Sequence, residues 1–347
     1  MKRKIIALVC SLGLIAWSCS KMDSGSSGLR QAVESGVSRI DHAVSKIESS
    51  TGYDLLSMND ATGKSDMAFN DTIELGDVAG IYDFQPDTML RFHCFSPYKL
   101  FKKTGESDNM IINLPEFMVY HPRHLHYFAF ADTVYPNNFT ITATDYHIYF
   151  NWWHNYEYKL TAGLSLDNED AGSMDVSSTS HSDHSNSYTS SFTFKDGYNI
   201  ASVWQDGDTA TSNFSLSNNS DTLFKESSMF IGQGYHMKEK YYDLTIGSVE
   251  LKKSPGIDSI QVFVNDVLQQ HAATIITNDT ENASVCNRMD IMLTYDDGTT
   301  AKLSDVLAPV KDELKTLRDS LRSMYFARNI VDYIAFSIYY DTHQYMP

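Results

Sequence analysis

Positive charge and cysteine are both scarce in this chain. It has 27 Lys and Arg residues against 44 Asp and Glu residues, which gives a formal net charge of −17. A surface this acidic repels the phosphates of nucleic acids and anionic lipid headgroups, so neither is expected as a partner. Past residue 19 the only cysteines are Cys94 and Cys286. In an oxidising compartment they form one disulfide or stay as two separate buried thiols.

Short catalytic motifs are absent as well. The chain contains no GxSxG elbow, phosphate-binding glycine loop, dinucleotide fingerprint, HExxH or paired CxxC. A carboxylate pair for glycoside hydrolysis meets in space and leaves no short motif. The motifs therefore leave open whether the protein is an enzyme.

The longest apolar run lies at the N-terminus. Lys2–Lys4 precede Ile5–Trp17, a run too short to span a bilayer as a helix but suited to the core of a signal peptide. We predict that residues 1–18 are a signal peptide, absent from the mature protein. Its removal takes away three cations, so the mature net charge is −17 − 3 = −20.

The end of this run, Ala16-Trp17-Ser18-Cys19, resembles the lipobox of bacterial lipoproteins, in which leucine, a small residue and Gly or Ala precede the cysteine. It departs from the pattern because the leucine is missing and Trp17 is bulky. The alternative is an ordinary signal peptide that happens to end in cysteine. Residues 19–28 are polar and rich in Ser and Gly, as a flexible tether is. The resemblance implies lipid on Cys19 and a membrane partner held through that lipid anchor.

Apolar residues at alternating spacings of three and four predict a helix near each end of the chain. In residues 29–50 they are Val33, Val37, Ile40, Val44 and Ile47. In residues 304–347 they are Val310, Leu314, Leu317, Leu321 and Met324, with Pro309 placed for a first helical turn. The two narrow stripes either pack on each other or cover a sheet separately. Residues 51–71 are interpreted as a linker.

The intervening residues, 72–303, alternate with a period of two and predict strands. The predicted strands are 139–149, 156–166, 188–194, 241–251, 259–264, 272–277, 289–295 and 299–303. No helical segment long enough for a parallel crossover lies between them, which disfavours an α/β fold. We expect an α+β fold, mainly antiparallel β, as a sandwich or partly open barrel with flanking N- and C-terminal helices.

Three finer expectations follow from local patterns. Turn residues at Asn265-Asp266 and Asp297-Gly298 indicate an antiparallel meander over 241–303. The serine-rich stretch 172–191 predicts a long loop or a solvated hairpin tip. Alternation in 331–340 predicts a closing strand.

Candidate metal ligands gather in one segment. His121, His124 and His126 lie in HPRHLH, with His93 upstream. They are interpreted either as a zinc site or, in the absence of a tight zinc signature, as structural histidines on a β-edge. The acidic stretches 167–170 and 206–208 suit calcium but complete no EF-hand loop, so solvated turns are the other interpretation. No cofactor is expected, with calcium and zinc left open.

Aromatic residues crowd the segment 146–158. A period of two places some of them on each face of a strand pair, where one face fills the core and the other presents flat rings outward. Tyr149, Trp152, Trp153 and Tyr156 are the candidate ligand-binding residues, with a glycan as the candidate ligand. The competing interpretation is an aromatic core on both faces.

A recurring tripeptide, Asp-Ser/Thr followed by a small or aliphatic residue, looks like the O-glycosylation acceptor of Bacteroidota envelope proteins. It begins at Asp71, Asp87, Asp132, Asp208, Asp221, Asp258 and Asp319. With the lipobox, it makes the chain resemble an uncharacterised Bacteroidota envelope lipoprotein. This resemblance implies a location in the cell envelope, at the outer membrane, rather than an activity.

These observations predict an anchored, non-catalytic protein that binds a ligand, such as a glycan, or acts as an envelope scaffold docked to another envelope protein. The alternative is an envelope hydrolase that uses a carboxylate pair or a histidine-bound metal.

Overall fold

The computed structural model of the chain describes residues 28–57, 71–85, 100–120, 135–151, 155–183, 185–232, 238–254, 260–270, 272, 275–278, 289–323 and 325–343. Its helices are α1 (Leu29–Glu48), α2 (Thr51–Ser57), α3 (Leu75–Val78), α4 (Phe117–Tyr120), α6 (Leu303–Val306), α7 (Lys311–Ser323) and α8 (Tyr325–His343). Its strands up to residue 194 are β1 (Asp71–Glu74), β2 (Gly80–Phe84), β3 (Phe101–Gly105), β4 (Met110–Leu114), β5 (Phe139–Phe150), β6 (Tyr156–Leu166), β7 (Glu169–Ser180) and β8 (Asn186–Phe194). The later strands are β9 (Tyr198–Asp206), β10 (Thr209–Asn218), β11 (Asp221–Ile231), β12 (Lys238–Ile246), β13 (Val249–Lys253), β14 (Gln261–Val264), β15 (Val267–Leu268), β16 (Ile275–Asn278), β17 (Met289–Thr294) and β18 (Thr300–Lys302).

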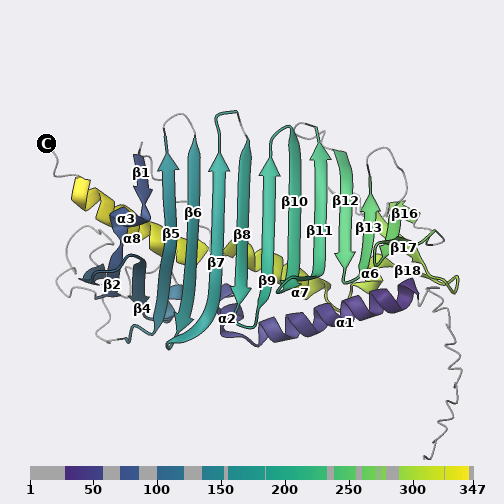
Figure 1. The fold of residues 1–347 in the computed structure, drawn as a ribbon, viewed down its shortest axis with the longest axis horizontal. Coiled ribbons are helices and arrows are strands. Elements are labelled where there is room, and N and C mark those ends of the chain that lie inside the picture. Colours follow the sequence, from purple (N-terminus) through teal and green to yellow (C-terminus); the bar gives the residue numbers. More distant parts are fainter. Residues whose placement is uncertain are drawn as a thin grey trace, which may run out of the picture.

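One large open sheet dominates the fold (Figure 1). Its strands follow the order β15-β14-β13-β12-β11-β10-β9-β8-β7-β6-β5-β4-β2-β3, and β1 also pairs with β5. From β4 and β5 onward, neighbouring strands are antiparallel, whereas β2 and β4 run parallel. A second sheet has the order β16-β17-β18. The sequence-based α+β class, mainly antiparallel β with terminal helices, is confirmed, and the large sheet stays open.

The two faces of the large sheet differ in chemistry. On one face, aliphatic and aromatic side chains such as Leu160, Phe192, Ile200 and Leu216 are fully buried. Figure 1 shows α7 and α8 passing behind the strands, which places them on this apolar face, while α1 runs along the lower ends of β9 to β13. The opposite face carries mostly Ser, Thr, Asn and charged residues, and none of the described helices crosses it in Figure 1. We call these the helix face and the uncovered face.

Helix α1 follows its predicted stripe closely. Val33, Ile40, Val44 and Ile47 are buried. The helix contacts β11, β12 and β13, whereas α7 contacts β8 and β9. Each helix therefore covers its own part of the sheet, which decides between the two arrangements left open by the stripes.

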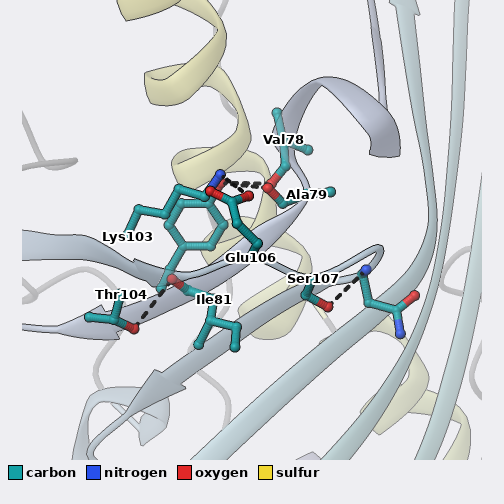
Figure 2. A network of polar contacts seen from close by, with 9 residues as sticks. Val78, Ala79, Ile81, Lys103, Thr104, Glu106 and Ser107 are labelled. Carbon is teal, nitrogen blue, oxygen red and sulfur yellow. Dashed lines mark hydrogen bonds and ion pairs between the residues drawn. The ribbon is translucent and has the colours of Figure 1, made fainter.

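A set of polar contacts holds the β2–β3 edge together (Figure 2). The Lys103 ammonium lies 2.7 Å from Glu106, and the Thr104 hydroxyl donates to the Ile81 carbonyl oxygen at 3.4 Å. The buried Tyr82 hydroxyl donates to the Val78 carbonyl oxygen at 2.9 Å. Burial, followed by the charge of Glu106, raises the pKa of Tyr82 to about 12, so this hydroxyl remains a donor at neutral pH.

The predicted closing strand at 331–340 is wrong, because these residues belong to α8. Ala327, Val331, Ile334 and Ala335 are all buried, at successive helical spacings of four, three and one. Phe336 is buried too, so one broad apolar helix face contains residues that also alternate. A period of two within such a face does not indicate a strand.

Of the two interpretations of residues 172–191, the long loop is wrong, and the stretch forms a hairpin instead. Most of this stretch lies in β7 and β8, which pair from Gly172–Phe194 to Ser180–Asn186. Its serines and threonines lie mainly on the uncovered face, where hydroxyl side chains remain solvated while the backbone is paired. The sequence therefore looked like a loop because one face of the hairpin needs no aliphatic residues.

Three boundaries also change. The predicted strand 241–251 is a hairpin, in which Gly247 at φ +58° makes the turn between β12 and β13. The predicted meander over 241–303 is divided, since β16 to β18 form the second sheet. The predicted linker 51–71 begins with α2, and β1 starts at Asp71.

Candidate functional site

A row of aromatic and serine side chains crosses the upper part of the helix face. Tyr188, Trp204, Ser212, Ser228 and Tyr242 are successive cross-strand partners on β8 to β12. Since directly opposed residues of a sheet share a face, these five side chains form one line, which we call the Trp204 row. Its direction follows from Ile200, which precedes Trp204 on the same side of β9 and is buried.

Trp204 is the most unusual member of this row. Its side of β9 is the core side, yet the residue is 40% exposed. Its register partners are Tyr188 on one side and Ser212 on the other, so no large side chain opposes it from β10. With strands about 4.8 Å apart, Trp204 and Tyr242 are separated by roughly 14 Å across the two serines. The row thus presents the rings of Trp204 and Tyr242 with two serine hydroxyl groups between them, and the ring of Tyr188 on the other side of Trp204.

Helix α7 is fastened to the sheet next to this row. Arg318 forms an ion pair with Glu226, and its guanidinium carbon lies 4.8 Å from the centre of the Phe214 ring. The Tyr242 hydroxyl donates to Glu226 at 3.2 Å. Glu226 and Phe214 are register partners in the row directly below the Trp204 row. These contacts hold Tyr242, at the β12 end of the Trp204 row, in place.

A second polar cluster is buried between α8 and the β5–β6 hairpin. The Tyr146 hydroxyl donates to Asp332 Oδ1 at 3.1 Å, and Arg328 Nε donates to Asp332 Oδ2 at 3.3 Å. Arg328 also donates to the Tyr156 hydroxyl and lies 4.0 Å from the centre of the Tyr158 ring. The Tyr158 hydroxyl affects the pKa of Asp332 but does not reach hydrogen-bond geometry.

Burial has the largest effect on the pKa values of Asp332 and Tyr146 in this cluster. It raises the pKa of Asp332 above its ordinary value, and the Arg328 guanidinium opposes the shift. Burial, followed by the charge of Asp332, raises the pKa of Tyr146 well above its ordinary value. Asp332 is only 4% exposed, so the cluster fastens α8 to the sheet and offers no surface to a large ligand.

The predicted aromatic platform is divided by the hairpin register. Tyr149 pairs with Glu157, whereas Tyr156 pairs with Phe150. Because Tyr149 and Phe150 are adjacent on β5, Tyr149 points to the uncovered face and Tyr156 to the helix face. There Tyr156 stacks on Tyr158 at a centroid distance of 6.3 Å. These two tyrosines therefore do not form one binding surface.

The other predicted site residues lie outside the described residues. They are the lipidation site Cys19, the candidate ligand-binding residues Trp152 and Trp153, the histidines His93, His121, His124 and His126, and the cysteines Cys94 and Cys286.

The acidic stretches proposed for calcium are hairpin turns. Asp167 and Asn168, at φ 52° and 65°, connect β6 to β7, a backbone shape typical of two-residue hairpin turns. Gly207 lies between β9 and β10. Within the described residues, no three His, Cys, Asp or Glu side chains gather in a way that suits a metal ion.

The aromatic residue that sequence reasoning missed is Trp204. A signal for it was present, because Tyr198, Ile200, Ser202 and Trp204 occupy one side of a strand on which apolar residues give way to serine. That change indicates where a core-facing strand leaves the core, and a large ring beyond that point is a candidate for a surface role.

Comparison of the chain with protein-family models, with curated proteins and with solved structures gives no match. Among the helices in the described part of the chain, none is both long enough and apolar enough to cross a membrane.

Proposed function

We propose that this protein is a lipid-anchored, non-catalytic binding protein of the cell envelope, attached to the outer membrane through Cys19, and that it binds glycan on the Trp204 row. The observation that carries the proposal is the exposure of Trp204 on the core side of its strand. Burying a tryptophan ring removes a large apolar area from water. Trp204 stays 40% exposed on this side. A ligand that covers its ring would therefore gain the free energy of that burial.

The chemistry of the row suits a sugar. Aromatic faces pack against apolar C–H surfaces, while hydroxyl groups need hydrogen-bonding partners. Trp204 supplies the flat surface. Ser212 beside it, and Ser228 on the next strand, supply groups that both donate and accept. The ion pair between Arg318 and Glu226 orders Tyr242 before a ligand arrives, which reduces the entropy lost on binding.

The anchoring part of the proposal rests on the N-terminal sequence. A mature net charge of −20 disfavours binding to anionic headgroups by the folded part. The polar tether at 19–28 leaves the lipid on Cys19 as the attachment. Substitution Cys19→Ala should move the protein from the membrane fraction to the soluble fraction. A variant that stays membrane-bound would show that the anchor lies elsewhere.

The binding part is tested with a glycan array followed by calorimetry on each hit. Substitution Trp204→Ala should weaken binding about tenfold or more, as loss of an aromatic anchor does. Tyr135→Ala is the matched control, because Tyr135 has the same 40% exposure but packs on Phe117, with ring centroids 4.2 Å apart, away from the row. No glycan binding by the parent protein, or equal binding by the parent and Trp204→Ala, contradicts this assignment.

A further inference from the structure

Two adjacent large apolar side chains are exposed at one end of the large sheet. Val267 is 62% exposed, the highest fraction among the large apolar residues of the described chain, and Leu268 is 42% exposed. They form β15, which stands last in the strand order of the large sheet. Because adjacent residues of a strand point to opposite sides, the two side chains flank this edge. Removing such side chains from water is favourable, so the pair is a candidate contact surface.

The hairpin that carries this pair is held by backbone hydrogen bonds. Asn265 and Asp266, at φ 48° and 63°, make the turn between β14 and β15, with the backbone shape of a two-residue hairpin turn. The Gln269 amide donates to the Val262 carbonyl oxygen at 2.9 Å and closes the hairpin. The exposure of the pair is therefore a property of a paired strand.

The turn of this hairpin lies near the first half of α1. The Asn265 amide donates to the Ser248 carbonyl oxygen at 2.9 Å, in the turn between β12 and β13. In the same turn, a Cβ on Gly247 would lie 3.2 Å from Gly36 Cα of α1. The helix from Leu29 to Gly36 spans only about 10 Å. Figure 1 shows α1 beginning at this end of the molecule, beside β18.

The start of α1 is also where the predicted tether joins the folded part. Arg30 lies 3.2 Å from Asp297, and its guanidinium carbon lies 4.7 Å from the centre of the Tyr295 ring. These contacts fix the first turn of α1 against the β17–β18 hairpin. From Gly28 back to Cys19, a fully extended chain covers at most about 30 Å. A lipid on Cys19 therefore keeps this end of the protein close to the bilayer.

The charges near the pair select the kind of membrane surface. Asp266 directly precedes Val267 in the chain. The Lys252 ammonium, on β13, lies 2.7 Å from Glu250, so its charge is directed to that carboxylate. A carboxylate beside the pair opposes contact with anionic headgroups. Neutral, zwitterionic headgroups accept the two apolar side chains without this repulsion.

We infer that Val267 and Leu268 enter the headgroup region of the bilayer that holds the lipid, which makes the β14–β15 hairpin a second membrane contact. The inference rests on the proposed anchor at Cys19. Two apolar side chains bind a bilayer weakly by themselves. The anchor confines them to a thin layer beside the bilayer and so raises their effective concentration. The contact orients the sheet with its β15 end toward the membrane.

Hydroxyl-radical footprinting read by mass spectrometry tests this orientation. The full mature chain, inserted into vesicles of phosphatidylcholine and phosphatidylethanolamine, is compared with the Cys19→Ala chain in solution. Vesicles should lower the oxidation of Val267 and Leu268 about threefold or more, because the headgroup region excludes most water from buried apolar groups. Ile231, at 43% exposure, is the matched control. It lies at the far end of β11, roughly 25 Å along the strand from the β12–β13 turn, and its oxidation should not change.

A double variant, Val267→Asn with Leu268→Asn, tests the role of the apolar groups. Phe263 is the cross-strand partner of Leu268, so vesicles should protect its ring in the parent protein and not in the double variant. Both substituted side chains are exposed, so the urea midpoint should stay the same. Ile231→Asn is the matched variant, and it should keep the protection of Phe263.

The outcomes separate this contact from the anchor. Equal oxidation of the pair in vesicles and in solution, or equal protection of Ile231, overturns the inference. Protection that appears without vesicles and grows with protein concentration assigns the edge to a second copy of the chain and also overturns it. The intact mass reports the lipid on Cys19 separately. Lipid without protection of the pair overturns this inference alone, whereas absence of the lipid overturns the proposed anchor together with it.

Discussion

The buried pair of Asp332 and Arg328 makes a strong prediction about stability. Their side chains are only 6% and 16% exposed, and the two charged groups are 3.3 Å apart. Removing one partner of a buried ion pair leaves the other charge without compensation, which typically costs about 3–5 kcal/mol. We expect Asp332→Leu to lower the free energy of unfolding by that amount, because Arg328 loses its counter-charge and the Tyr146 hydroxyl loses its acceptor.

Urea denaturation followed by circular dichroism measures this effect. The midpoint should fall while the denaturant dependence stays constant. In a thermal scan of a chain this long, the same loss corresponds to about 4–7 °C in Tm. The matched control is Tyr146→Phe, which removes only one hydrogen bond to a charged group and should cost about 1.5–3 kcal/mol.

A double variant completes the test. Replacing both partners, with Asp332→Leu and Arg328→Met together, removes the uncompensated charge and should recover most of the loss. If Asp332→Leu is as stable as the parent protein, or if the double variant is no more stable than Asp332→Leu, the cluster does not hold α8 to the sheet as argued.

Two further predictions concern packing and pH. Gly36→Ala should cost about 1–3 kcal/mol, because the added Cβ would lie 2.8 Å from the Ile246 carbonyl oxygen. Gly163→Ala, whose Cβ would meet nothing within 4 Å, is the control, and equal urea midpoints would contradict the argument. Stability should also fall in alkali, because burial raises the pKa of both Tyr82 and Tyr241 from 10.0 to about 12. Their contribution is complete below pH 10 and is lost as pH rises from 10 through 12; thermal scans across this range that show a constant Tm would refute it.

Local patterns predicted the elements whose determinants lie close together in the chain. The apolar stripe predicted α1 correctly because one face of this helix packs on the sheet. The turns at Asn265-Asp266 and Asp297-Gly298 were readable too, since Asn265, Asp266 and Gly298 adopt positive φ angles of 48°, 63° and 77°. In each case neighbouring residues carry the whole signal.

Sequence patterns did not identify the secondary structure where the same residue types occur in two kinds of element. The serines of β7 and β8 left a long loop and a hairpin tip as alternatives, because the side of these strands on the uncovered face needs no apolar side chains. The broad apolar face of α8 contains a period of two, which looked like a strand. Composition alone does not separate these cases; the environment on each side of the element does.

The candidate site shows the same division. The sequence by itself determined the acidic charge, the antiparallel alternation and the terminal helices, because these depend on composition and on residues a few positions apart. Only the tertiary structure decided that Tyr149 and Tyr156 face opposite ways and that Tyr188 lies beside Trp204. Cross-strand register sets these neighbours, and register depends on how whole strands pair and which face is buried.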